Sequence, residues 1–216
     1  MDGVTIGGRD GRAHHPRRPT LFGPAVVDTF VGGPDPAQRI EAAHTTAQAL
    51  VRHARSADAA TTARLVALTD EHGIDEVADL WADRPATTLP GALWRLYALR
   101  AGIRRDPLDH ARAFDAGRHR APVHEAVAGV AAPPGPQEVT ELADAVLTGA
   151  FTGDLAVALE RAGAFCRVVS TGWAVLADDD PDTERGGALT KRAAGLLRTG
   201  GQLETAAGRW REGTLN

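Results

Sequence analysis

The stretch DLAVALERAGAFCRVVSTGWAVLA, residues 154–177, decides the fold class. Its apolar residues recur three and four positions apart, which is the spacing of a helix face, and further apolar residues cover most of the remaining surface. A helix that is apolar on nearly all sides belongs in the interior of a protein. We therefore expect residues 154–177 to form the central helix of an all-α protein.

The rest of the sequence favours the same fold class. Alanine is the commonest residue and aromatic residues make up only 5% of the chain, whereas strands are enriched in β-branched and aromatic side chains. Helical spacing of apolar residues dominates from Pro36 onward. We expect a single compact bundle of about eight helices, the last two covering residues 183–198 and 202–212.

Gly- and Pro-rich segments divide the chain. Residues 1–35 offer little to bury and are expected to form a flexible tail and an extended arm. Residues 36–130 are expected to form an N-terminal helical group, followed by a Pro-rich connector over residues 131–136. Residues 137–216 are expected to form a C-terminal helical group that packs on the first.

Charge and cysteine content narrow the class of protein. The chain has 28 acidic and 24 basic residues, a net charge of -4, so it lacks the broad positive field of a general nucleic-acid packaging protein. Its single cysteine, Cys166, cannot form an internal disulfide and suits a reducing compartment. We find no secretory signal and no run long enough to span a membrane, so we expect a cytoplasmic protein with no membrane partner.

Common enzyme signatures are missing. The sequence contains no GxxxxGK[ST] phosphate loop, no GxGxxG opening a helix after a strand, and no GxSxG. His110, His119 and His124 do not have the spacing of paired metal ligands on a helix. We therefore expect no cofactor and no metal, and we assign no catalytic residue.

A candidate contact face lies on the helix expected over residues 91–105. Trp94, Tyr97 and Arg104 recur on a face other than the apolar one, with Arg105 beside them. Aromatic residues interleaved with arginine are typical of protein interfaces, so this face predicts a protein partner. Alternatively, the two aromatic side chains pack under a neighbouring helix and the arginines are only solvated.

A candidate ligand site lies on the central helix. Arg161 projects from a face that looks buried, and a buried guanidinium needs a carboxylate or a bound anion. Arg161 could hold an anionic ligand, with Glu160 available for proton transfer and Arg167 nearby. Alternatively, Arg161 forms an internal ion pair, and Glu160 and Arg167 form the one stripe of the helix that meets solvent.

One segment resembles a known family of regulators. EHGID at residues 71–75, VADL at 77–80 and LWRLY at 93–97 are similar to the helix-turn-helix of tetracycline-repressor-type regulators. The resemblance implies a DNA-binding unit over residues 62–100 whose helix with Trp94, Arg95 and Tyr97 enters the major groove. The turn from Arg84 to Pro90 is longer than in that family and the preceding helix is acidic, so we assign no family.

Three functions remain open. The first is a non-enzymatic interaction or regulatory module that docks a protein partner through Trp94, Tyr97, Arg104 and Arg105. The second is a helix-turn-helix DNA-binding regulator that uses residues 62–100. The third is an enzyme or small-anion binder with a pocket beside the helix of residues 154–177. We rank the interaction module first, because no nucleophile, base and orienting group come together in the sequence.

Overall fold

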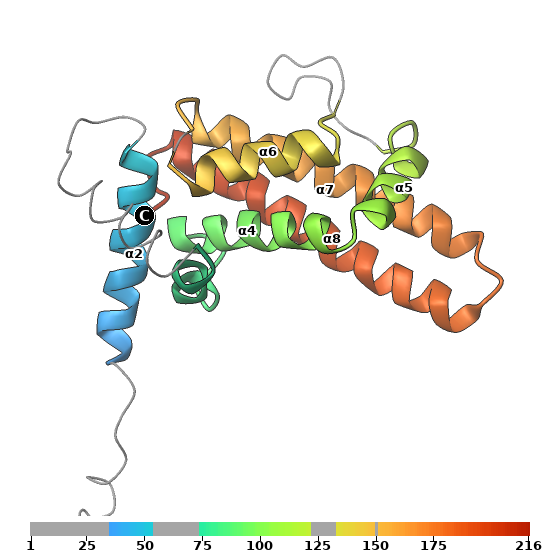
Figure 1. The fold of residues 1–216 in the computed structure, drawn as a ribbon, viewed down its shortest axis with the longest axis horizontal. Coiled ribbons are helices and arrows are strands. Elements are labelled where there is room, and N and C mark those ends of the chain that lie inside the picture. Colours follow the sequence, from blue (N-terminus) through green and yellow to red (C-terminus); the bar gives the residue numbers. More distant parts are fainter. Residues whose placement is uncertain (1–34, 54–73, 122–132, 150) are drawn as a thin grey trace, which may run out of the picture. The chain divides into compact units, whose positions relative to one another are not determined.

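The computed structural model describes residues 35–53, 74–121, 133–149 and 151–216. Every regular element in these ranges is a helix, which confirms the all-α prediction, and the helices number seven where about eight were expected. One helix covers residues 74–81; the other six are α2 (Pro36–His53), α4 (Leu89–Arg105), α5 (Pro107–Gly117), α6 (Pro136–Leu147), α7 (Leu155–Asp178) and α8 (Thr183–Arg211) (Figure 1).

The residues expected to form a tail and an arm lie outside the described part of the chain, apart from Asp35. The first two residues of the expected connector, 131 and 132, also lie outside it. Residues Pro36–Asn216 form one compact unit. Within this unit α4 packs against α6, α7 and α8, so helices from before and after the connector share one core.

The long helix α7 lies at the centre of this core. Asp154 caps its N-terminus, because the side-chain Oδ1 accepts a hydrogen bond of 3.0 Å from the amide of Ala156. Most residues along α7 are buried, including Phe165 and Trp173, and α5, α6 and α8 all pack against it. The predicted central helix is therefore confirmed, with its boundaries moved by one residue at each end.

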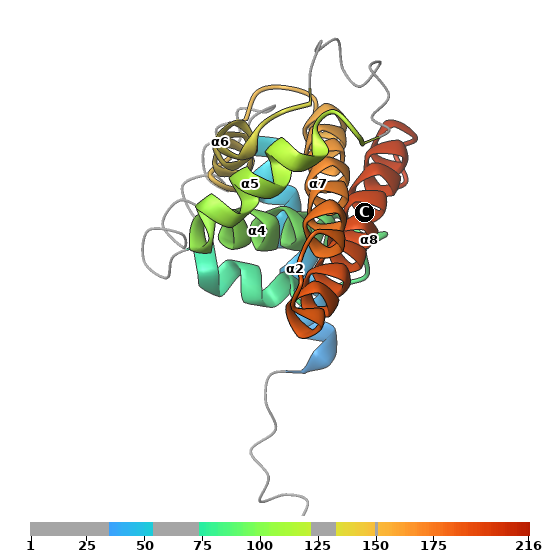
Figure 2. The same cartoon turned by 90° about the vertical axis from the view of Figure 1, so that its right-hand side faces the viewer.

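Helix α8 lies alongside α7 at very short range (Figures 1 and 2). A Cβ atom added to Gly200 would lie 3.0 Å from the Cβ of Cys166 and 3.1 Å from the carbonyl oxygen of Gly163. A Cβ on Gly163 would in turn lie 3.2 Å from the carbonyl oxygen of Gly200. The two helices thus approach very closely at this crossing, and a side chain at either glycine would require the neighbouring atoms to shift.

The sequence-based boundary within α8 is wrong. We expected one helix to end near residue 198 and another to begin near 202, because Gly200 and Gly201 are typical of a helix end. The structure shows one continuous helix from Thr183 to Arg211, capped by Asp182. Gly200 is needed for contact with α7, and that packing compensates for its low helix propensity.

A second glycine contact joins α5 to α7. A Cβ on Gly172 would lie 1.7 Å from the carbonyl oxygen of Ala113, and a Cβ on Gly117 would lie 2.0 Å from the carbonyl oxygen of Val168. Neither position has room for a side chain unless the helices separate. Phe114 of α5 stacks on Phe165 of α7 beside this crossing, with ring centroids 6.0 Å apart.

Helix α4 runs antiparallel to α8. Arg209 of α8 donates to the carbonyl oxygen of Thr87, Gln202 accepts from Arg95, and Arg192 pairs with Asp109 just beyond the end of α4. On its other side, α4 contacts α6 through Asp144, which pairs with both Arg100 and Arg104. The inner face of α4 is apolar, with Leu93, Leu96, Leu99 and Ile103 buried.

Substitutions of two helical glycines test the backbone contact of α5 and α7. Gly172→Ala forces its methyl group onto the Ala113 carbonyl and should destabilise the fold by about 1 to 3 kcal/mol or more. Gly187→Ala has open space around it on α8 and should stabilise the fold by about 0.5 to 1 kcal/mol. Chemical denaturation measures both, and equal effects of the two variants would contradict the backbone contact.

Cys166 reports on the contact between α7 and α8. Complete burial, with Glu204 nearby, raises the pKa of its thiol well above the usual range, which suppresses the reactive thiolate. Because it is the only cysteine, a thiol-reactive dye should find no reactive group in the folded chain at neutral pH and one in denaturant. Rapid labelling of the folded chain would show that the contact opens readily.

Candidate functional site

A groove of about 450 Å³ runs between α4 and α8. Figure 2 shows these helices together with α5 and α7, which pack beside them. The α4 wall consists of residues spaced along one side of the helix: Trp94, Arg95, Ala98, Leu99, Gly102 and Arg105. The α8 wall consists of Arg192, Gly195, Leu196, Thr199 and Gln202. His110 of α5 and Trp173 of α7 complete the lining.

The lining is strongly one-sided in charge. Three arginines and one histidine line the groove, and no carboxylate from the described part of the chain does. Arg105 and Arg192 have acidic neighbours just outside it: Arg105 Nε lies 3.5 Å from Asp106 Oδ2, and Arg192 Nη2 lies 2.9 Å from Asp109 Oδ2. A positively lined groove in a chain of net charge -4 is a local departure from the protein's overall charge.

Arg95 differs from the other two arginines because neutral groups hold it. Its Nε donates to Gln202 Oε1 at 2.6 Å and its Nη1 donates to the carbonyl oxygen of Gly91 at 2.7 Å. It makes no ion pair with any described residue. Burial lowers the pKa of Arg95, as expected for a cation removed from water without a counter-ion.

The opposite end of the groove is a packed aromatic cluster. Trp173 Nε1 donates to Asp109 Oδ2 at 3.1 Å, and the guanidinium of Arg192 lies 4.3 Å from the centroid of the Trp173 ring. The ring of His110 meets Trp173 edge-on at 5.2 Å. These contacts join Trp173, Arg192 and His110 to one another at this end of the groove.

His110 itself is 5% exposed and has a defined orientation. Its Nδ1 lies 2.9 Å from the carbonyl oxygen of Asp106, which can only accept, so Nδ1 carries the proton. The Nε2 atom would lie 3.9 Å from a Cβ on Gly102 and has no hydrogen-bond partner among the described residues. The Nε2 atom of His110 therefore faces Gly102 of α4.

The predicted contact face, Trp94, Tyr97, Arg104 and Arg105, is divided by the structure. Trp94 and Arg105 line the groove, whereas Arg104 Nη2 donates to Asp144 Oδ2 of α6 at 2.6 Å. Tyr97 stacks on Trp94 with centroids 5.5 Å apart. Both aromatic side chains are partly buried against the core. Each therefore packs in part under neighbouring elements, as the alternative prediction stated, and remains partly exposed.

The predicted ligand residues on α7 do not come together at either cavity. Glu160 pairs with both terminal nitrogens of Arg211, and Arg167 pairs through two hydrogen bonds with Glu204, so both tie α7 to α8. The hydrogen bond from Arg167 to Glu204 raises the pKa of Arg167. Arg161 is partly exposed, has no ion pair with a described residue, and its buried Nε has no hydrogen-bond partner there.

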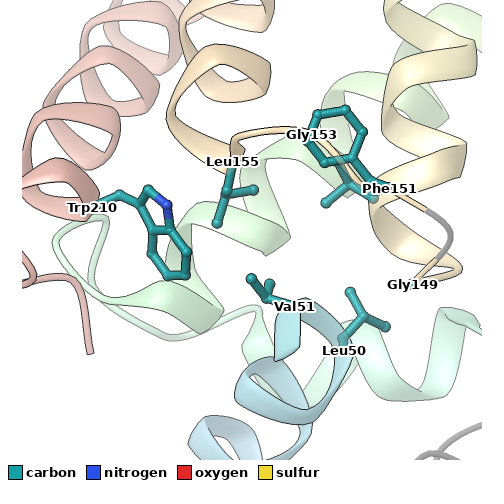
Figure 3. Close-up of a pocket in the computed structure, with 8 residues that line it drawn as sticks. Leu50, Val51, Gly149, Phe151, Gly153, Leu155 and Trp210 are labelled. Carbon is teal, nitrogen blue, oxygen red and sulfur yellow. The ribbon is translucent and has the colours of Figure 1, made fainter. Parts of the chain in front are cut away.

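A second, smaller cavity lies where the ends of α2, α6, α7 and α8 meet (Figure 3). Its volume is about 10 Å³, which is room for about one water molecule. Val51 and Leu50 of α2 face Leu155 and Trp210 across it, and its lining is almost entirely apolar. It is a gap in the packing of the core and offers no group that could recognise a ligand.

Sequence reasoning missed most of the groove. Arg95 appeared only within the resemblance to repressors, and Trp173 was assigned to the buried stripe of α7. Arg192 and Gln202 belong to segments that were expected to be separate helices. The only sequence signal for the groove was the face with Trp94 and Arg105, because the other residues approach it through packing of helices far apart in sequence.

The helix-turn-helix alternative involves residues 62–100, of which residues 62–73 lie outside the described part of the chain. The helix of residues 74–81 is followed by a turn and then by α4. Eight residues of α4 are buried, and its outer side faces α8 across the groove. Ala98, Arg104 and Arg105 of α4 are exposed, and the helix-turn-helix function stays a prediction.

Comparison with protein-family models, with curated proteins and with solved structures gives no match for this chain. Among the described helices, none combines the length and the apolar character needed to cross a membrane. The description of the site therefore depends on the geometry of the groove alone.

Titration of Tyr97 tests the contact between α4 and the helix of residues 74–81. Partial burial and the hydrogen bond of 2.8 Å that Tyr97 donates to Asp75 Oδ1 raise the pKa of Tyr97. Since it is the only tyrosine, tyrosinate absorbance should appear at higher pH in the folded chain than in the unfolded chain. Asp75→Asn should lower this pKa, because it removes the negative charge beside the phenol.

The same shift predicts the sign of a pH effect on stability. A phenol with a raised pKa in the folded state favours folding below pH about 10 and loses that contribution as pH rises further. Tyr97→Phe should remove this alkaline loss, measured by denaturation at a series of pH values. An identical pH dependence in the Tyr97→Phe variant would show that the hydrogen bond to Asp75 contributes nothing.

Proposed function

We propose that this protein is a binding module that docks an acidic segment of a partner protein in the groove between α4 and α8. One observation carries the proposal: among the described residues, the groove is lined by three arginines, by the partly exposed Trp94 and the buried Trp173, and by no carboxylate, in a chain whose net charge is -4. Tryptophan and arginine are the residues most enriched at the energetic centres of protein interfaces. Charge complementarity favours an anionic partner.

The length of the groove supports a peptide segment rather than a small molecule. Arg95 and Arg105 lie at opposite ends of the α4 wall, about 15 Å apart along the axis at about 1.5 Å per residue. A small anion could contact only one of these ends. An extended segment of about five residues, or a helix of about ten, spans both ends while an apolar side chain covers the partly exposed Leu196 between them.

Other parts of this chain fit the groove less well than a partner does. Residues 1–35 carry four arginines and four aspartates, so this segment has no net negative charge for the arginines of the groove to attract. The acidic residues 178–184 follow α7 and could reach the groove of a second copy. Self-association of the purified protein, abolished by neutralising residues 178–184, would identify a second copy as the occupant and would replace the present proposal.

The proposal retains the predicted docking function but changes the set of residues that carry it. Trp94 and Arg105 belong both to the predicted face and to the groove. The groove adds Arg95, Trp173 and Arg192. Tyr97 stacks on Trp94. The predicted set Glu160, Arg161 and Arg167 lies outside the groove, and the arginines and tryptophans of its lining favour binding. DNA is disfavoured as an occupant, because a chain of net charge -4 lacks the broad positive field that binding to a phosphate backbone needs.

A charge reversal in the groove tests the docking function. The probe is a synthetic peptide of about ten residues with alternating Glu and Leu, compared with the same peptide carrying Gln for Glu. Arg105→Glu should weaken binding of the Glu peptide about tenfold, because it places like charges together at one end of the groove. Arg118→Glu is the charge-matched control, because Arg118 is exposed at the end of α5 and lies outside the groove.

Tryptophan fluorescence or titration calorimetry measures both variants. Equal weakening by Arg105→Glu and Arg118→Glu would mean that the peptide senses only overall charge. Equal affinity of the unaltered protein for the Glu and Gln peptides would contradict the proposal that the groove selects an acidic partner.

A further inference from the structure

We propose that Arg95 and Gln202 form a carboxylate subsite within the groove, which receives one Asp or Glu side chain of the partner. This inference rests on the proposed docking function and specifies which contact gives it selectivity. The two residues come from opposite walls, Arg95 from α4 and Gln202 from α8, and they are joined by one hydrogen bond of 2.6 Å.

The hydrogen bond fixes which atoms face outward. A guanidinium has only donors, so the atom of Gln202 that meets Arg95 must be the carbonyl oxygen Oε1. The amide nitrogen of Gln202 therefore points away from Arg95 and has its own donors free. No hydrogen bond to Gln202 Nε2 or to Arg95 Nη2 is made by any described residue, and both side chains line the groove.

The unpaired nitrogen atoms of the two side chains thus create a corner of hydrogen-bond donors. Arg95 Nη2 contributes charged donors and Gln202 Nε2 contributes neutral ones. The nearest local acceptors, Gln202 Oε1 and the carbonyl oxygen of Gly91, are already used by Arg95. A carboxylate is the group that best satisfies such a corner, since its two oxygens accept side by side and its charge matches the guanidinium.

The energetic argument points to the same ligand group. Arg105 and Arg192 each have an aspartate beside them, so part of their charge is already balanced. Arg95 has only dipoles as partners, and a partly buried cation without a counter-ion is less stable than one that is paired. A carboxylate that enters the groove therefore gains more at Arg95 than at either of the other arginines.

Gln202→Glu is the most direct test, because it places a carboxylate on Arg95 from within the protein. The change preserves the size of the side chain and should not impair folding, since it supplies the missing counter-ion of Arg95. Gln48→Glu on α2 adds the same charge outside the groove and is the matched control. We expect Gln202→Glu to weaken binding of the Glu–Leu peptide about tenfold more than Gln48→Glu does.

A second variant and a peptide series locate the contact. Arg95→Lys keeps the positive charge but loses the planar fork, and it should weaken binding of the same peptide several-fold. Single Glu→Gln changes along the peptide should reveal one position at which the unaltered protein loses affinity. That loss should disappear in the Gln202→Glu protein, because the subsite is then already occupied.

The outcomes separate the two proposals. If the unaltered protein prefers the Glu peptide and Arg105→Glu weakens it, but Gln202→Glu behaves like Gln48→Glu, docking stands and the subsite is wrong. If the unaltered protein does not bind the Glu peptide in preference to the Gln peptide, the docking function and the subsite both fall. If one Glu→Gln change in the peptide weakens binding to the unaltered protein but not to the Gln202→Glu protein, the carboxylate subsite is supported.

Discussion

The architecture depends on the close approach of the backbone of α7 to two other helices. Gly172 and Gly117 allow contact with α5, and Gly163 and Gly200 allow contact with α8. At the α5 crossing a single methyl group would collide with a carbonyl oxygen of the other helix, and at the α8 crossing it would lie only 3.0 to 3.2 Å from a carbonyl oxygen or a Cβ atom. Because the helices touch through their backbones, their separation and angle cannot adjust by repacking long side chains. This constraint holds α7 at the centre and fixes the positions of α5 and α8 around it.

The groove follows from that arrangement. Helix α8 is held close to α7, whereas α4 is held to α6 through Asp144 and meets α8 only along part of its length. Between α4 and α8, glycines at 102 and 195 leave space that long side chains would otherwise fill. Trp173 of α7 lines this space but is only 3% exposed, because Asp109 binds its indole nitrogen and Arg192 lies over its ring. The groove thus follows from helix placement, with Arg95 of α4 at one end and Arg105 of α4 and Arg192 of α8 at the other.

The sequence predicts the local elements of this protein much better than the contacts between them. Helix α7 and its cap at Asp154 could be predicted because apolar periodicity and capping chemistry are properties of neighbouring residues. The pair Gly200 and Gly201 was misread as a helix end, because its contact partners, Gly163 and Cys166, lie in another helix. The same reason hid the groove: Arg95 and Gln202 meet only once α4 and α8 are aligned antiparallel. Arg167 and Glu160 carried the right chemistry for a ligand, but their charges are satisfied by Glu204 and Arg211.

The overall charge of the chain constrains how an acidic partner would be recognised. At a net charge of -4 the long-range field does not attract an anionic segment, so electrostatic steering contributes little to its rate of association. Attraction begins only within about 8 to 10 Å at physiological salt, where the arginines of the groove outweigh the distant acids. Selectivity must then come from contacts formed after encounter, through the apolar floor and the uncompensated charge of Arg95. A module built in this way discriminates by the position of a carboxylate along the partner segment rather than by the partner's total charge.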